Sequence, residues 1–223
     1  MDRKVLGILG GMGPLATAHF FQGILKWTKA EKDWDHLRVI IDNNVDIPSR
    51  TRALLYGEES PVQAMRQACF ALMDIGCDYI AVPCNSAHSF YNEVIKDTDI
   101  PWANMIRIVA EALTNYKNVL ILGGYSTIHN RTYDEYADNT IYFKDNSLVY
   151  AIIEDTKVNT ADHTRLNCLY KNINDLNVDC VLLGCTELPM MFEKDKVNCE
   201  VVDGNEIYIK ELIKMCGGTV KYE

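Results

Sequence analysis

The sequence predicts an α/β protein with two similar domains, each a mostly parallel sheet flanked by helices. Short apolar runs alternate along the chain with longer segments of helical period, a pattern typical of parallel sheets connected by helices. The chain also repeats two of its segments in the same order, as expected for a duplicated domain. Its 223 residues are 48% hydrophobic, which is enough to bury a core in one large or two small domains.

Six apolar runs are the expected strands, at residues 5–9, 37–42, 79–83, 119–122, 180–183 and 200–202. One helix is predicted to begin with Ser60 as N-cap, Pro61 at the first helical position and Gln63 completing a capping box, and to end at Gly76. A last amphipathic helix is predicted from Asn205 to Cys216.

Two pairs of segments carry the internal repeat. The segment "VLGILGGMGPLAT", from Val5, resembles "NVLILGGYSTIHN", from Asn118. Further along, "CDYIAVPCNSA", from Cys77, resembles "VDCVLLGCTEL", from Val178. Each half thus has a strand that ends in a glycine turn and a later strand that ends in Pro-Cys or Gly-Cys.

From this repeat we predict an N-terminal domain over residues 1–103 and a C-terminal domain over residues 104–204. The last helix, about residues 205–223, is expected to return to the first domain. Ligands of open parallel sheets bind beyond the carboxyl ends of the strands, where both cysteine turns fall. The expected site is therefore a cleft between the domains.

Composition and charge exclude several classes of partner. The net charge is −9 and no Lys/Arg run stands out, so nucleic acid and anionic membranes are poor partners. The start "MDRKVLGILGG" shows no cleavable signal pattern, and the apolar runs are far shorter than the ~18 residues that span a bilayer. Eight cysteines without C-x-x-C or zinc spacing are expected to be free thiols. We expect a cytoplasmic, reduced protein that binds no metal.

The first glycine turn, Gly11 to Ala16, formally fits the G-x-G-x-x-G/A dinucleotide fingerprint, and Asp42 ends the next expected strand. However, Pro14 removes a backbone N–H that a pyrophosphate would use, and the second glycine turn lacks the fingerprint. A tight strand-to-helix turn, or a turn that offers its N–H groups to a carboxylate, is favoured over a nucleotide site.

The cysteines divide into two groups. Cys84 and Cys185 stand where a strand gives way to a helix, a position expected to lower the thiol pKa and favour the thiolate. The others fall within helix or strand patterns and are expected to be small core residues: Cys69, Cys77, Cys168, Cys180, Cys199 and Cys216.

His88, one turn after Cys84, is a candidate base for a thiol but is more simply a packing or surface residue. The polar loop "NNVDIPSRTRALL" carries Arg50 and Arg52, either of which is surface charge or a carboxylate ligand at a strand end.

Taken together, "GILGGMGPLAT", "NNVDIPSRT", "PCNSAH" and "LLGCTELP" resemble the aspartate/glutamate racemase family. The resemblance spans nearly the whole chain, and the motifs occur in the family's order. It implies two similar α/β domains with the active site between them, a small acidic amino acid as substrate, no cofactor and, in many members, a homodimer. Cys84 and Cys185 would face opposite sides of the substrate Cα, one removing the α-proton and the other donating a proton.

The resemblance also implies the substrate ligands. Arg50 would bind the distal carboxylate, Glu187 would orient the amine, and Lys157 matches a basic residue of the family. The α-carboxylate and the ammonium would be held by donors near Met12, Asn85, Ser86, Thr127 and Thr186.

Two features refine this expectation. Having cysteine at both positions resembles the members that racemise both enantiomers. The second glycine turn departs from the family pattern, because Ser126, Asn130 and Arg131 stand in place of small residues, and "VVDGNEI" departs further on. Alternatives that keep the fold are a hydantoin racemase, a maleate isomerase, a decarboxylase, or a carboxylate-binding protein without catalysis.

Overall fold

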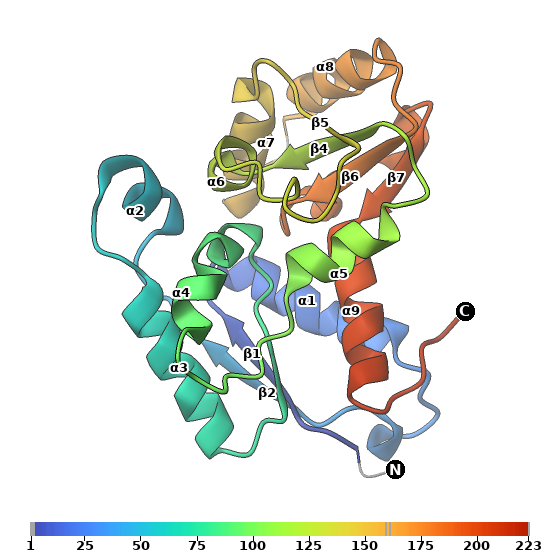
Figure 1. The fold of residues 1–223 in the computed structure, drawn as a ribbon. Helices are drawn as coiled ribbons and strands as arrows, with labels where there is room; N and C mark the ends of the chain where they lie inside the picture. Colours follow the sequence, from blue (N-terminus) through green and yellow to red (C-terminus); the bar gives the residue numbers. More distant parts are fainter. Residues whose placement is uncertain (1–2, 159, 161, 223) are drawn as a thin grey trace.

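The computed structural model describes residues 3–158, 160 and 162–222. Two parallel sheets, one above the other in Figure 1, organise this part of the chain. The first has the strand order β2-β1-β3, and the second has the order β5-β4-β6-β7. The predicted α/β class with two similar units is confirmed, whereas the predicted domain boundaries stay a prediction.

The first sheet pairs β1 (Leu6–Gly10) with β2 (Val39–Asn43) on one side and β3 (Tyr79–Ala81) on the other. The helical elements of this half are α1 (Pro14–Trp27), η1 (Asp33–Asp35), α2 (Arg50–Tyr56), α3 (Val62–Asp74), η2 (Asn85–Phe90) and α4 (Tyr91–Ile95). The central strand β1 is fully buried, because it is flanked on both edges and covered on both faces.

The second sheet has β4 (Val119–Gly123) between the two-residue β5 (Thr140–Ile141) and β6 (Cys180–Gly184), with β7 (Glu200–Asp203) beyond β6. Its other elements are α5 (Met105–Ala112), α6 (Tyr125–His129), α7 (Ser147–Lys157), α8 (His163–Asn174), η3 (Leu188–Met190) and η4 (Lys194–Lys196). Strand β5 was not predicted, because two half-buried residues carry no periodic signal.

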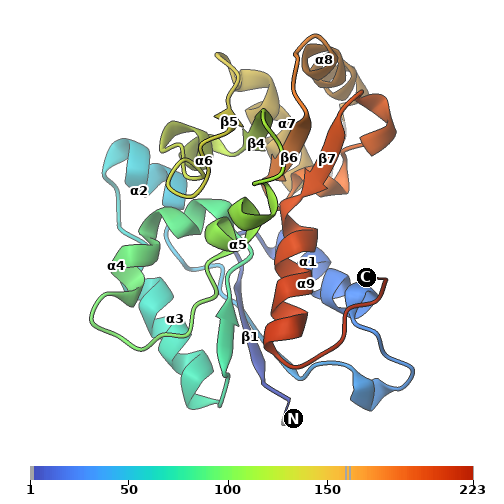
Figure 2. The same ribbon diagram turned by 45° about the vertical axis from the view of Figure 1, so that its right-hand side comes forward.

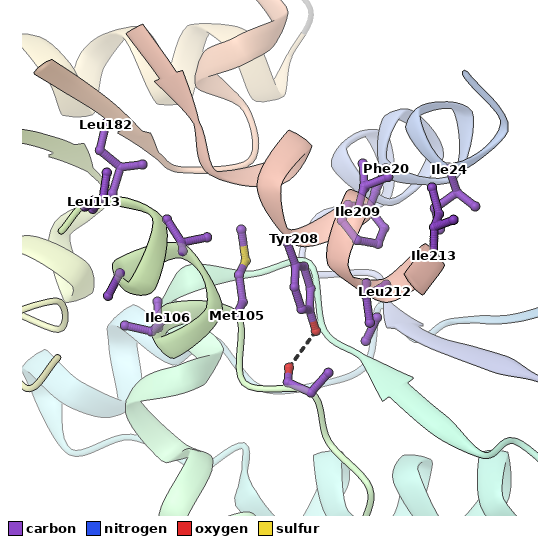
Figure 3. Packing of buried hydrophobic residues seen from close by; sticks show 14 of the residues in the cluster. Phe20, Ile24, Met105, Ile106, Leu113, Leu182, Tyr208, Ile209, Leu212 and Ile213 are labelled. Atoms are coloured by element: carbon purple, nitrogen blue, oxygen red, sulfur yellow. Dashed lines mark hydrogen bonds between the residues drawn. The ribbon is translucent and has the colours of Figure 1, made fainter. Parts of the chain in front are cut away.

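The last helix, α9 (Gly204–Met215), leaves the second sheet and runs beside α1 of the first (Figures 1 and 2). Its buried residues pack with Phe20 and Ile24 of α1 and with Met105 and Ile106 of α5 (Figure 3). The Tyr208 hydroxyl donates to Ala103 O at 2.7 Å and accepts from Val82 N at 3.2 Å. These contacts tie the C-terminal helix to the end of the first sheet.

The predicted helix after Ser60 begins one residue late. Pro61 is its N-cap rather than its first residue, and no side-chain cap forms at this end of the helix, which lies within the described residues; Ser60 Oγ instead accepts from Val62 N at 3.4 Å. The helix ends at Asp74 with Ile75 as its C-cap, one residue before the predicted Gly76. Gly76 follows with a φ of 95°, a left-handed conformation that glycine adopts without strain.

Cys168 contradicts the prediction that it is a core residue, because it is exposed. The buried face of α8 consists of Leu166, Leu169, Tyr170 and Ile173, and residue 168 projects from the other side. Cys199 is only half-buried. In the described part of the chain, no helix combines the length and the apolar character needed to cross a bilayer.

Candidate active site

A cavity of about 240 Å³ is lined by the ends of elements from both sheets. All ten residues selected from the sequence line it: Met12, Arg50, Cys84, Asn85, Ser86, Thr127, Lys157, Cys185, Thr186 and Glu187. They come from six separate stretches of the chain, which only the folded structure brings together.

The parallel strands bring the two thiols to this cavity. Strand β3 pairs with β1, and the chain leaves β3 through Val82 and Pro83 to reach Cys84, the N-cap of η2. Strand β6 pairs with β4, and Cys185 follows its last residue directly. Because the carboxyl ends of parallel strands lie on one edge of a sheet, each cysteine is delivered to the edge where ligands of such sheets bind.

Cys185 belongs to a small polar cluster. Its Sγ donates to Glu187 Oε2 at 3.0 Å, and the Thr186 hydroxyl donates to the same oxygen at 3.0 Å. The Glu187 side chain is buried, so its carboxylate is held by these two donors rather than by bulk water. Burial raises the pKa of the Cys185 thiol well above its ordinary value, and the charge of Glu187 raises it further.

Cys84 is also buried, and burial raises the pKa of its thiol. The nearby guanidinium of Arg50 acts in the opposite direction and favours the thiolate. The expectation that a strand-to-helix position lowers both thiol pKa values is therefore wrong for this structure. Desolvation exceeds the effect of the short 3₁₀ helix that follows Cys84, so both sulfurs are protonated at neutral pH.

Arg50 is the first residue of α2, a helix hidden within the polar loop that the sequence presented as irregular. Its Nη1 donates to Ile47 O at 3.1 Å and Pro48 O at 2.9 Å, which fixes the guanidinium to its own loop. Its buried Nε has no hydrogen-bond partner among the described residues. The same is true of the buried Thr127 hydroxyl on α6. These are two polar groups on the cavity wall that a bound carboxylate would satisfy.

Asn85 follows Cys84 and is buried. Its Oδ1 accepts a hydrogen bond of 2.6 Å from the hydroxyl of Tyr133, and its Nδ2 lies 3.9 Å from Met105 Sδ. Beside it, Ser86 is half-buried, and Met12 is a buried residue in the first glycine turn.

Lys157 ends α7 and makes an ion pair of 2.6 Å with Glu154, which also lines the cavity. Although partial burial opposes its charge, the hydrogen bond to Glu154 and the negative charges of Glu154 and Glu187 raise the pKa of Lys157. It therefore supplies a second positive charge to the cavity.

His88 is not placed to act as a base for either thiol. Its Nδ1 lies 2.9 Å from the Cys84 carbonyl oxygen, and its Nε2 accepts from Trp102 Nε1 at 3.2 Å and Met105 N at 3.1 Å. Burial lowers the pKa of His88 to about 4. The neutral ring holds the backbone of the Cys84 turn, so its role is structural.

Sequence reasoning missed several cavity residues: Ser49, Thr51, Leu55, Gly124, Tyr125, Tyr150, Ile153, Glu154 and Gly184. Those on α7 had a detectable signal. Residues 150, 153, 154 and 157 share one face of a helix. Once Lys157 is assigned to the site, the other three residues of this face are therefore expected to line it as well. Within the described residues, no group of three or more His, Cys, Asp and Glu side chains could hold a metal ion.

The chain matches the family model described as Asp/Glu/Hydantoin racemase over residues 9–212. A solved aspartate racemase from Picrophilus torridus is 34% identical, with a TM-score of 0.87 over 98% of this chain and 96% of that one. The "Broad specificity amino-acid racemase RacX" of Bacillus subtilis (strain 168) is 24% identical over 94% of this chain and 96% of its own length.

A glutamate racemase from Thermus thermophilus, solved with β-chloro-D-alanine, shares the fold at 18% identity, with a TM-score of 0.65 over 96% of this chain and 80% of that one. The family match, the likeness to the Picrophilus torridus enzyme and the paired strand-end cysteines agree. The chain belongs to the Asp/Glu/Hydantoin racemase family and is an amino-acid racemase, an isomerase.

Proposed function

We propose that this protein inverts the α-carbon of aspartate, glutamate or both, without a cofactor, by proton transfer between Cys84 and Cys185 through the substrate. One observation carries the proposal: two thiols at the ends of equivalent strands, β3 and β6, line one cavity. A racemase acts on mirror-image substrates and therefore needs a proton donor and acceptor on each face of the Cα. A protein that only binds a carboxylate has no such requirement.

In the proposed reaction, one sulfur as thiolate takes the α-proton while the other, as thiol, delivers a proton to the opposite face. Turnover leaves the enzyme with the other sulfur protonated, so the reverse reaction exchanges the two roles and the proton count balances. Both thiols are protonated in the free protein, so one must first lose its proton. Glu187, 3.0 Å from Cys185 Sγ, is the proposed acceptor on that side.

On the Cys84 side, the positive charge of Arg50 is the group that favours the thiolate. The two sulfurs are therefore activated by different neighbours, a cation for Cys84 and a carboxylate for Cys185. Fixed dipoles and charges on the cavity wall must stabilise the enolate-like α-carboxylate that forms when the proton leaves. Donors near Met12, Asn85, Ser86, Thr127 and Thr186 are the proposed ones, as the resemblance to the family implies.

The cations support an acidic substrate. Arg50 offers a buried Nε with no partner among the described residues, and we assign it the distal carboxylate. Lys157 is assigned the α-carboxylate, and Glu187 is assigned the ammonium. An amino acid with two carboxylates and one ammonium matches two cations and one anion.

A wider amino-acid range is the second candidate, because one observation favours it. Glu154 also lines the cavity, so the four charged side chains there, Arg50, Lys157, Glu154 and Glu187, sum to zero. A neutral zwitterion is then tolerated, in line with the name of the Bacillus subtilis relative. The homodimer and the cytoplasmic location stay predictions, and the first is checked by sedimentation of the purified protein.

Proton NMR in D₂O tests the proposal. The purified, reduced protein is incubated with L-aspartate, L-glutamate or L-alanine without added cofactor. Loss of the α-proton signal together with formation of the D-isomer is expected for an acidic substrate. The same result with alanine would show that the enzyme accepts a wider range of amino acids. No exchange with any of them would reject the racemase proposal.

Four variants accompany this assay. Cys84→Ser and Cys185→Ser are each expected to lower turnover by about a hundredfold or more, as for the loss of a catalytic base. The matched control is Cys168→Ser, which changes an exposed thiol outside the cavity and should leave turnover unchanged. Arg50→Ala should weaken turnover of aspartate more than that of alanine, and an equal loss for both would contradict the role assigned to Arg50.

A further inference from the structure

Tyr133 lies outside the cavity lining but touches both cysteine turns. It is fully buried, in the segment between α6 and β5, and its hydroxyl donates to Asn85 Oδ1 at 2.6 Å. Its ring lies against Gly184: a Cβ atom placed on this glycine would be 3.4 Å from Tyr133 Cε2, within van der Waals contact. Asn85 follows Cys84, and Gly184 precedes Cys185. One side chain thus contacts the neighbour of each thiol.

The hydrogen bond also orients the Asn85 amide. Burial raises the pKa of the Tyr133 phenol, so the hydroxyl stays protonated at any physiological pH. A protonated phenol that donates to Asn85 requires the oxygen of the amide, not its NH₂ group, to face the tyrosine. Among the described residues, the amide nitrogen has only the weak contact to Met105 Sδ at 3.9 Å. Asn85 can therefore offer an N–H donor to a ligand in the cavity that it lines.

Ser126 on α6 and Asn130 directly after this helix also make side-chain hydrogen bonds to the first half of the chain. Ser126 Oγ lies 3.2 Å from Thr51 Oγ1, and Asn130 Nδ2 donates to Ser89 Oγ at 3.3 Å. The Asn130 bond is exposed to solvent and the Ser126 bond is half-buried, whereas the Tyr133 bond is fully buried. The Tyr133 bond is therefore the one of the three that is best protected from exchange with water.

We propose that Tyr133 is a positioning residue: it fixes the Asn85 amide as a donor to the substrate carboxylate and holds the Cys84 turn in register with the Cys185 turn. The kinetic part of this inference rests on the proposed function. The orientation of the amide does not, and it is measured separately.

The kinetic test is a double-mutant cycle with Tyr133→Phe, Asn85→Ala and the double variant. Phenylalanine keeps the ring on Gly184 and removes only the hydroxyl. Tyr133→Phe should lower kcat/KM about tenfold, as for the loss of one hydrogen bond. In the Asn85→Ala background it should change kcat/KM by less than about twofold, because the amide through which it acts is gone. Losses that multiply in the double variant would overturn the proposal.

A second variant distinguishes the role of the Asn85 amide oxygen from that of the amide nitrogen. Asn85→Asp keeps an oxygen for the Tyr133 hydroxyl but removes the N–H donor. It should lose activity as Asn85→Ala does, and its melting temperature should fall because position 85 is buried and a carboxylate there is desolvated. Full activity in this variant would overturn the donor role assigned to Asn85.

The structural test needs no turnover. In ¹⁵N–¹H spectra, the Asn85 side-chain amide is assigned by its disappearance in Asn85→Ala. Tyr133→Phe should shift this signal and accelerate its exchange with solvent, and an unchanged signal would overturn the proposal. Tyr170→Phe on α8 is the matched control, since its hydroxyl accepts a partly buried hydrogen bond of 2.8 Å from Glu193 N and lies outside the cavity lining. If the wild type racemises neither aspartate nor glutamate, the proposed function fails, while the spectra still decide the role of Tyr133.

Discussion

Lowering the pH from 7 to 5 should destabilise this protein through one buried imidazole, that of His88. The ring nitrogens are fully used: Nδ1 faces the Cys84 carbonyl, and Nε2 accepts from the Trp102 indole and from Met105 N. A proton added at Nε2 would remove both accepted bonds and leave a charge in the core. Protonation of His88 is therefore coupled to loss of the packing around the Cys84 turn.

The magnitude follows from the shifted pKa. Burial, partly opposed by the backbone hydrogen bond to Cys84, lowers the pKa of His88 to about 4, against an ordinary value near 6.5. Because the pKa is lower in the folded state, the stability from His88 is fully present above pH 6.5 and is lost as the pH falls towards 4. Between pH 7 and pH 5 the loss is about 2 kcal/mol.

Urea unfolding of the wild type and of His88→Gln at pH 7, 6 and 5 measures this loss. The free energy of unfolding should fall by about 2 kcal/mol more in the wild type than in the variant over this range, since glutamine does not titrate. Taking the difference removes the contribution of carboxylates common to both proteins. His19→Gln, at an exposed histidine, should keep the wild-type dependence. The same pH dependence in His88→Gln and the wild type would refute the reasoning.

Two further predictions concern charged residues near the cavity. Glu154→Gln frees Lys157 from its 2.6 Å ion pair and should therefore lower KM for aspartate by about two- to fivefold at low salt. The control is Glu111→Gln, which removes the exposed ion pair between Arg107 and Glu111. An unchanged KM would remove Glu154 from the specificity argument. Arg131 has a φ of 48°, where a β-branched residue is strained, so Arg131→Val should cost about 2 kcal/mol of unfolding free energy. Arg131→Gly should change the free energy of unfolding by less than about 1 kcal/mol, because the relieved backbone strain offsets the lost ion pair with Asp134. Thermal melts of the two variants measure the difference, and equal melting temperatures would contradict the prediction.

Arg131 is one of three residues at which the second glycine turn departs from the family pattern. From the sequence, Ser126, Asn130 and Arg131 are three replacements of small residues. In the structure, Arg131 occupies a left-handed position that glycine would occupy without strain, and Ser126 and Asn130 make hydrogen bonds to the first half of the chain. None of the three lines the cavity.

The sequence alone determined the local features of this protein. Alternating apolar runs set the strands, Gly76 ended a helix with a left-handed residue, and the segments after β3 and β6 marked Cys84 and Cys185. These signals are local because apolar periodicity, capping and turn conformation depend on residues within a few positions of one another.

Only the tertiary structure decided what depends on contacts between distant segments. Helix α2 forms inside a polar loop, and Tyr133 reaches Asn85 across 48 positions. The thiol pKa values are raised, not lowered, because desolvation is a property of the packed cleft. A sequence states which groups are present, whereas burial and long-range neighbours set their charge and orientation, and these exist only once the two sheets have been brought together.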